Sequence, residues 1–264
     1  MQDESIRPAF GWCGTLDKAA DLHAAGLDYL ELQLVPLRLE DDTAFADAKA
    51  RVRDLPLPSP VMSYLFPHDL RLVGPVVQEA RARAYVDRVI ELMSAAGARH
   101  VVYGSGWTRN IPEGFDTAQA QDQFLRALQW CGEAVGAIGA TLVIEPLNRR
   151  ESNQCNHVAE GIAWARRTGL PNVQGLADFY HVDEEAEPLA LLAECGGALA
   201  HVHLADTDRM NPGTGRYDYP AFFGALKRAG YAGRFSAECG VRGEPVAGMR
   251  FSADFLRRTW AQAG

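Results

Sequence analysis

Four acidic or imidazole side chains each stand at the end of a short apolar run in the second half of the sequence: Glu145, Asp178, His203 and Glu238. Their separations are 33, 25 and 35 residues, and a chain of 264 residues divided into eight equal units has a repeat of 264/8 = 33 residues. Each step therefore matches about one β-strand with its following helix. We expect the four side chains to meet at one end of a parallel barrel, where the strands' carboxyl ends place catalytic groups.

Three carboxylates crowded at one rim would repel one another and shift toward protonation unless a cation neutralised them. A lone acid at a strand end is usually a helix N-cap or part of a surface ion pair, but four at unit spacing have no such reason to face inward. We predict a divalent metal site. Three oxygen donors with one imidazole favour Mn²⁺, with Mg²⁺, Co²⁺ or Zn²⁺ as alternatives.

Short β-rich apolar runs alternate with longer amphipathic stretches along the whole chain, which is typical of βα units and a parallel sheet. The predicted class is α/β: a single (β/α)8 TIM barrel with a parallel eight-stranded core, in one domain spanning residues 1–264. Helical spacing is clearest at 81–96 and 118–139, and a glycine follows many helices. The eight predicted strands are Ala9–Cys13, Tyr29–Gln33, Pro60–Tyr64, His100–Tyr103, Thr141–Pro146, Val173–Phe179, Leu199–Ala205 and Arg234–Cys239.

Strand alternation predicts which of these side chains face the barrel axis. Val143 shares the inward face with Glu145, and Ser236 shares it with Glu238, whereas Ile144 points to the helices. By the same alternation His201 faces inward one layer below the rim. We interpret it as a packed, hydrogen-bonded core residue.

The composition of the chain indicates which classes of binding partner and which compartment to expect. A formal net charge of -8 disfavours nucleic acid and anionic membranes. Five scattered cysteines without CxxC spacing indicate reduced thiols, and no apolar run is long enough to span a membrane. Because Met1–Ser5 is acidic and lacks an apolar leader segment, we expect a cytoplasmic protein.

At these residues the sequence resembles the sugar phosphate isomerase/epimerase group, the xylose isomerase-like barrels that include the ketose 3-epimerases. The resemblance covers nearly the whole chain. It implies that the quartet binds the metal, that Glu151, His181 and Arg209 contact the substrate, and that the protein forms a dimer or tetramer. Its most specific motifs are Val143–Asn148, Asp178–His181, His201–Arg209 followed by Pro212 and Gly213, and Gly230–Gly233 leading into Glu238.

The chemistry expected of such a site is removal of a proton next to a carbonyl of a ketose or related sugar, through an enediolate. Glu145 and Glu238 are the candidate catalytic bases. If they act from opposite faces of the substrate, the carbon is inverted and the enzyme is an epimerase. If one group carries the proton between neighbouring carbons on one face, the enzyme is an aldose–ketose isomerase, and the sequence leaves both open.

Aromatic side chains near the ends of three strands are candidates for an apolar wall against a sugar. Trp12, Phe66 and Trp107 form this set, with His68 beside them. The turn at 211–215, Asn-Pro-Gly-Thr-Gly, follows the seventh predicted strand and is a candidate mobile lid.

Three other functions compete with this prediction. A DNA-repair endonuclease on the same barrel needs many histidines, but the fourth predicted strand ends in Tyr103-Gly104-Ser105 without one, and the net charge opposes DNA. A dehydratase or lyase acting on a keto-inositol or oxidised sugar would use the same proton abstraction. A non-catalytic sugar-binding barrel is opposed by the pair Glu145 and Glu238.

Overall fold

The computed structural model describes residues 8–264 and forms a closed barrel of eight parallel strands in sequential order, with β8 pairing to β1. Met1–Ser5, on which the expectation about a leader segment rests, lies outside the described residues. All eight predicted strands are confirmed. They are β1 (Phe10–Gly14), β2 (Tyr29–Gln33), β3 (Val61–Ser63), β4 (His100–Tyr103), β5 (Thr141–Ile144), β6 (Val173–Asp178), β7 (Leu199–Leu204) and β8 (Arg234–Ala237).

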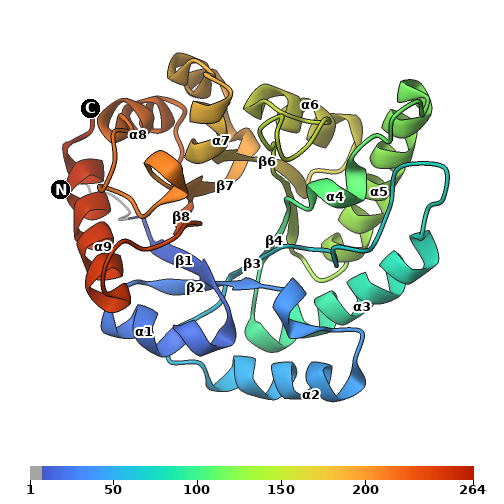
Figure 1. Ribbon diagram of the computed structural model, residues 1–264, viewed down its shortest axis with the longest axis horizontal. Coiled ribbons are helices and arrows are strands. Elements are labelled where there is room, and N and C mark those ends of the chain that lie inside the picture. Colours follow the sequence, from blue (N-terminus) through green and yellow to red (C-terminus); the bar gives the residue numbers. More distant parts are fainter. Residues whose placement is uncertain (1–7) are drawn as a thin grey trace.

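Helices surround the barrel, so that Figure 1 shows the strands at the centre and the helices in a ring around them. The helices predicted near 81–96 and 118–139 are confirmed as α3 and α5. Within residues 8–264 no helix has both the length and the hydropathy needed to cross a membrane. The helices are α1 (Ala19–Ala24), α2 (Asp42–Arg51), α3 (Glu79–Ala96), α4 (Gly106–Arg109), α5 (Thr117–Gly136), α6 (Val158–Arg167), α7 (Phe179–Glu184), α8 (Tyr219–Arg228) and α9 (Pro245–Gln262).

Glycine ends several of these helices in the left-handed conformation that the sequence predicted. Gly97 is the C-cap of α3 with φ 69°, and a Cβ at this position would meet nothing within 4 Å, so backbone conformation and not space requires the glycine. The same positive φ recurs after α1, α5, α6 and α8, at Gly26, Gly139, Gly169 and Gly230.

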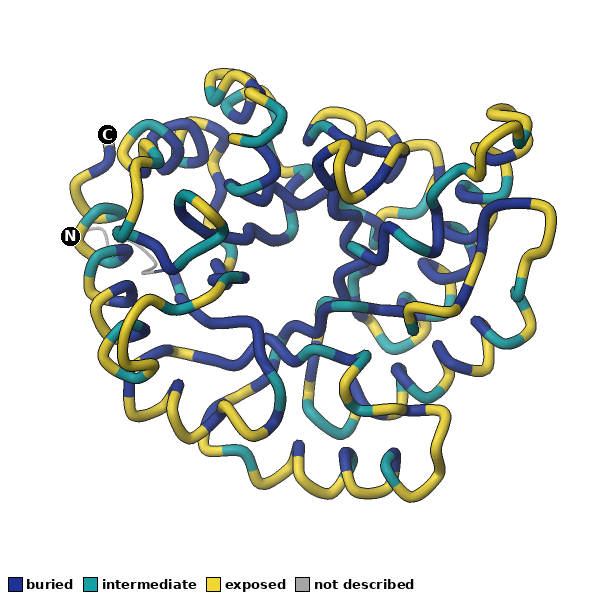
Figure 2. The backbone as a smooth tube through the Cα atoms, in the orientation of Figure 1, coloured by how far each residue is buried: buried dark blue, intermediate teal, exposed yellow. Residues whose placement is uncertain are grey.

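The barrel has an inner and an outer apolar layer. Val143 belongs to the inner cluster, with Tyr29, Val61, Val102 and Leu176, whereas its neighbour Ile144 packs outward in the cluster that contacts the helices. This confirms the predicted alternation. Figure 2 shows the result as a buried centre within an exposed outer ring of helices. Because the inner layer is filled by side chains, an open site is expected above it, at the carboxyl ends of the strands.

Candidate metal and substrate site

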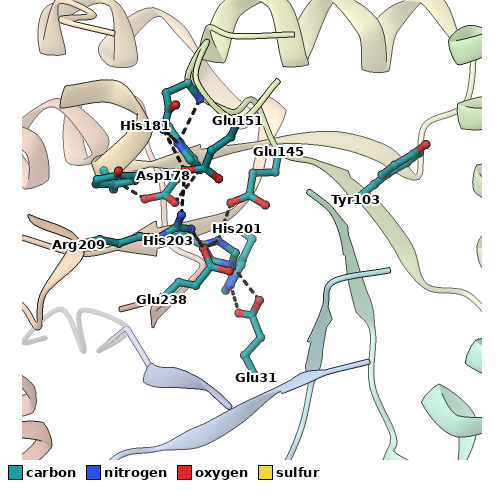
Figure 3. Close-up of polar contacts among 12 residues, drawn as sticks. Glu31, Tyr103, Glu145, Glu151, Asp178, His181, His201, His203, Arg209 and Glu238 are labelled. Atoms are coloured by element: carbon teal, nitrogen blue, oxygen red, sulfur yellow. Dashed lines mark hydrogen bonds and ion pairs between the residues drawn. The ribbon is translucent and has the colours of Figure 1, made fainter. Parts of the chain in front are cut away.

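The four side chains of the predicted quartet converge above this layer (Figure 3). Glu145 directly follows β5, Asp178 ends β6, His203 lies in β7 and Glu238 directly follows β8. One potential ligand atom from each lies within 4.8 Å of all the others, and all four residues are buried. The four side chains therefore meet at one height on four adjacent strands, as the spacing along the sequence predicted.

The polar atoms of the quartet are incompletely paired. Asp178 Oδ1 accepts a hydrogen bond from the backbone of Tyr180 and so caps α7, but its Oδ2 is buried without a partner. His203 Nδ1 lies 2.9 Å from Glu145 Oε1 and 3.7 Å from Glu238 Oε2. Asp178 is therefore both a helix cap and a free oxygen donor.

The protein alone does not stabilise all the carboxylates of this site in their charged forms. Burial, followed by the charge of Glu145, raises the pKa of Asp178 to about 7. Burial also raises the pKa of Glu145. Because three carboxylates with one imidazole are a donor set for a divalent ion, a cation here would satisfy the unpartnered Asp178 oxygen and restore both carboxylates to their charged forms. The residues present fit such an ion.

The carboxylate of Glu145 occupies space left by a missing side chain. A Cβ built on Gly104 would lie 1.8 Å from Glu145 Oε2. The fully buried guanidinium of Arg109, on α4, donates to the backbone carbonyls of Glu145 (2.7 Å) and Tyr103 (3.2 Å). Glu145 is thus held at its backbone, and its carboxylate rests against a glycine.

Arg209, predicted to contact substrate, reaches the site from the loop after β7. Its guanidinium donates to Glu238 Oε2 at 2.6 Å and to Glu151 Oε1 at 3.0 Å, and it lies 4.8 Å above the ring of Tyr180. Asp208 and Arg209 both have positive φ, 64° and 54°, which is costly for residues with a Cβ. This backbone turns the Arg209 side chain toward the carboxylates.

The arginines that precede Glu151 in the sequence do not pair with it. Arg149 pairs with Glu185 and Arg150 pairs with Glu184. The ion pair of Glu151 is instead with Arg209.

His181 is held in one orientation beside Asp178. Its Nδ1 accepts a hydrogen bond from the backbone N–H of Asn148 at 3.1 Å, so Nε2 must carry the proton in the neutral ring. That Nε2 is buried without a hydrogen-bond partner and lies 3.6 Å from Asp178 Oδ2. Burial, then the charge of Arg209, places the pKa of His181 well below its usual value, so the ring is a neutral donor.

A cavity opens directly over Glu145 and Glu238. Trp107, on α4, lines it as predicted, with its ring stacked on Tyr64 at 6.3 Å and beside His68 at 4.1 Å. Its indole N–H donates to the Pro67 carbonyl. The lining residues are Tyr64, Gly104, Gly106, Trp107, Glu145, Leu147, Glu151, Arg209 and Glu238.

Two predicted wall residues lie elsewhere, and the structure corrects their assignment. Trp12 is 1% exposed and packs in the outer apolar cluster, because strand alternation gives the inward position on β1 to Cys13. Phe66 is fully buried with its ring against Tyr103 and Trp130. Neither side chain lines the cavity, so both belong to the core between strands and helices.

The expected lid is also corrected. The Asn211 side chain is fully buried and donates to Ser252 Oγ at 2.8 Å, while its oxygen accepts from the backbone of Arg242. The backbone N–H of Gly213 donates to Asp206. This turn is fastened to α9 and to the end of β7, which does not fit a segment that opens and closes.

Sequence reasoning missed the buried carboxylate that supports the quartet. Glu31, on β2, is 0% exposed and lies against two imidazoles: its Oε1 is 2.8 Å from His203 Nε2 and its Oε2 is 2.7 Å from His201 Nε2. His201 is thus the hydrogen-bonded core residue that was expected. The signal was available, since Glu31 is the only charged residue in the strand Tyr29–Gln33 and has an inward position. Tyr64, Gly104 and Arg109 carried no comparable signal.

Comparison with known proteins adds an independent line of evidence. The family model for the xylose isomerase-like TIM barrel matches residues 19–259. The chain is 30% identical over 200 residues to the 3-dehydro-D-guloside 4-epimerase of Escherichia coli (strain K12), covering 70% of this chain and 74% of that one. It is 37% identical over 125 residues to the L-ribulose 3-epimerase of Mesorhizobium japonicum, covering 46% of this chain and 42% of the relative, so this match spans less than half of that protein.

The fold is also that of solved structures. A crystal structure of a 3-keto-D-glucoside 4-epimerase from E. coli superposes with a TM-score of 0.80 at 23% identity, covering 95% of this chain and 99% of that chain. At this identity the match establishes the fold alone.

Proposed function

The chain belongs to the xylose isomerase-like TIM barrel family, and on this basis we propose that it is a divalent-metal-dependent sugar epimerase or isomerase. The substrate is a ketose or a keto sugar, from which a proton next to the carbonyl is removed. The single observation that carries this proposal is that Glu145 and Glu238, from β5 and β8, line the same cavity beside Asp178 and His203. The sugar-epimerase relatives support the reaction class.

The proposed ligands are Glu145, Asp178, His203 and Glu238, and Mn²⁺ is the ion that best suits their donor atoms. When bound, a divalent ion supplies positive charge that stabilises the enediolate formed by proton loss, an effect of several kcal/mol. Glu145 and Glu238 are the proposed bases, each moving a proton on its own side of the substrate. Transfer to the opposite face inverts the carbon, and therefore we propose epimerisation in preference to isomerisation.

The remaining polar side chains position the substrate. Arg209 is anchored on Glu238 and Glu151, so its remaining N–H groups can donate to a substrate oxygen. The neutral His181 carries its proton on Nε2, which makes no hydrogen bond within residues 8–264 and can donate one to the substrate. Trp107 and Tyr64 supply an apolar face for the sugar's C–H groups.

The test is incubation of the protein with Mn²⁺ and a panel of ketoses and keto glycosides in D₂O, with products identified by NMR. We expect an epimer that carries one deuterium at the inverted carbon. Glu145→Gln and Glu238→Gln remove a base without changing side-chain size, and each is expected to lower turnover by about 100- to 10,000-fold.

Glu91→Gln provides the matched control, because Glu91 is 58% exposed and pairs with Lys49 on the outside of the barrel. It should turn over like the wild type. Undiminished turnover in either site variant would contradict the proposed bases. A product lighter by one water, with an enone absorbance, would instead identify a dehydratase.

A further inference from the structure

A buried carboxylate below the quartet contacts a proposed ligand from behind. Figure 3 shows Glu31 on the far side of the His203 ring from Glu145, with contacts running to both His203 and His201. All three residues are at most 1% exposed. Glu31 does not line the cavity over Glu145 and Glu238, and its contacts run to the two imidazoles instead.

We infer that Glu31 is a positioning residue that fixes the ring of His203 for metal binding, with His201 as the strut that holds Glu31 in place. The inference rests on the proposed metal-dependent function. An ionised carboxylate only accepts hydrogen bonds, so each imidazole facing Glu31 must place a proton on Nε2. In His203 this directs Nδ1, the other ring nitrogen, toward Glu145 and Glu238.

Both oxygens of Glu31 are used in this arrangement. Oε1 lies 2.8 Å from His203 Nε2 and Oε2 lies 2.7 Å from His201 Nε2, and the two imidazole planes are nearly perpendicular at 89°. Contacts from two directions allow the carboxylate one orientation. Cys13 lies against the same group, because its Sγ belongs to a set with Glu31 and His203 whose atoms are within 4.8 Å of one another. Without this support the His203 ring is free to rotate its ligand nitrogen out of the site.

An isosteric amide tests the arrangement. In Glu31→Gln the side chain keeps its shape, but one end becomes an N–H donor that cannot face an imidazole N–H. We expect its affinity for Mn²⁺, measured by isothermal titration calorimetry on the full chain, to fall about 10- to 100-fold. Unchanged affinity would overturn the inference.

Tyr29→Phe is the matched control. Tyr29 lies on the same strand and faces the same interior, where its hydroxyl is 2.8 Å from Ser236 Oγ and makes no hydrogen bond to His201 or His203. This variant loses one buried hydrogen bond next to the site and is expected to keep wild-type affinity for Mn²⁺. A loss of affinity equal to that of Glu31→Gln would mean that any disturbance of this inner layer weakens Mn²⁺ binding, and it would also overturn the inference.

A measurement on the wild type covers the case in which Glu31→Gln does not fold. Long-range ¹H–¹⁵N NMR on protein saturated with Mg²⁺ should report the proton of His203 on Nε2, and a proton on Nδ1 would refute the inference. Failure of the proposed function is distinguishable, because the wild type itself would then bind neither Mn²⁺ nor Mg²⁺.

Discussion

Every ionisable group of the quartet is buried, so its protonation depends on its immediate neighbours. Asp178 shows this most directly, because burial and the adjacent Glu145 together raise its pKa to about 7. Its unfolded carboxyl would titrate near 3.9. In protein without bound metal, Asp178 therefore costs stability as pH rises from about 4 to about 7, since the unfolded chain releases this proton first.

Metal binding should carry the opposite pH dependence. A divalent ion must displace the Asp178 proton below pH 7, so apparent affinity is expected to rise about tenfold per pH unit up to about pH 7 and then to level off. Calorimetric titration of Mn²⁺ in buffers with different ionisation enthalpies measures the released protons. Affinity that is flat between about pH 5.5 and about pH 7, the range in which the ion must still displace the Asp178 proton, would contradict the assignment of Asp178 as a ligand.

Gly104 should be as necessary to the site as a charged residue. Gly104→Ala places a methyl group 1.8 Å from the present position of Glu145 Oε2, so the carboxylate must move. We expect a loss of turnover of about 100-fold, as for other misplaced catalytic groups. Gly197→Ala is the control, because a Cβ there meets nothing within 4 Å and the backbone is unstrained. Wild-type turnover in both variants would show that Glu145 does not act from this position.

At the scale of elements, the ends of β5 to β8 carry the quartet, and the segments after β3 and β4 carry the apolar wall. Trp107 reaches the cavity from α4, just beyond β4, and Tyr64 reaches it from directly after β3. Phe66, two residues further along, turns back into the layer between the strands and the helices. Proximity to a strand end therefore does not place an aromatic side chain in the site.

Leucine substitutions distinguish the structural role of Phe66 from the substrate-contacting role expected of Trp107. Phe66→Leu removes a ring from a fully buried contact and should lower the free energy of unfolding by about 1–3 kcal/mol with an unchanged KM. Trp107→Leu should raise KM severalfold, and its loss of the bond to Pro67 costs stability of about 1 kcal/mol. Urea unfolding and steady-state kinetics on both variants give the comparison. A raised KM in Phe66→Leu alone would return that residue to the site.

At the scale of the whole molecule, the quartet ties together β5, β6, β7 and β8, which pair consecutively, and Arg209 joins the loop after β7 to the end of β8. An ion held by side chains from all four strands cannot bind the unfolded chain in the same way. We therefore expect folding and binding of the proposed ion to be linked.

Mn²⁺ at one hundred times its dissociation constant should stabilise the protein by about 2.7 kcal/mol, seen as a rise in Tm. Asp178→Asn should lose most of this shift because it removes a charged ligand. Glu91→Gln, outside the barrel, should keep it in full. If Mn²⁺ raises the Tm of the wild type and of Asp178→Asn equally, the ion binds elsewhere.

The sequence by itself determined the barrel and the quartet. Strand residues alternate with period two and each βα unit spans about 25 to 35 residues, so an acid or imidazole at each strand end is enough to predict that Glu145, Asp178, His203 and Glu238 meet. The resemblance to the family added Glu151, His181 and Arg209, and the structure places all three beside the quartet.

Tertiary structure alone decided the rest, because these features depend on contacts between distant segments. The contact between Glu31 and His203 joins residues 172 positions apart, and the space for Glu145 depends on a glycine that directly follows the neighbouring strand β4. Which aromatic lines the cavity depends on loop backbone, as at Tyr64 with its φ of 55°. No repeat or period in a single sequence encodes such pairings, since each follows from how distant segments pack once the barrel has closed.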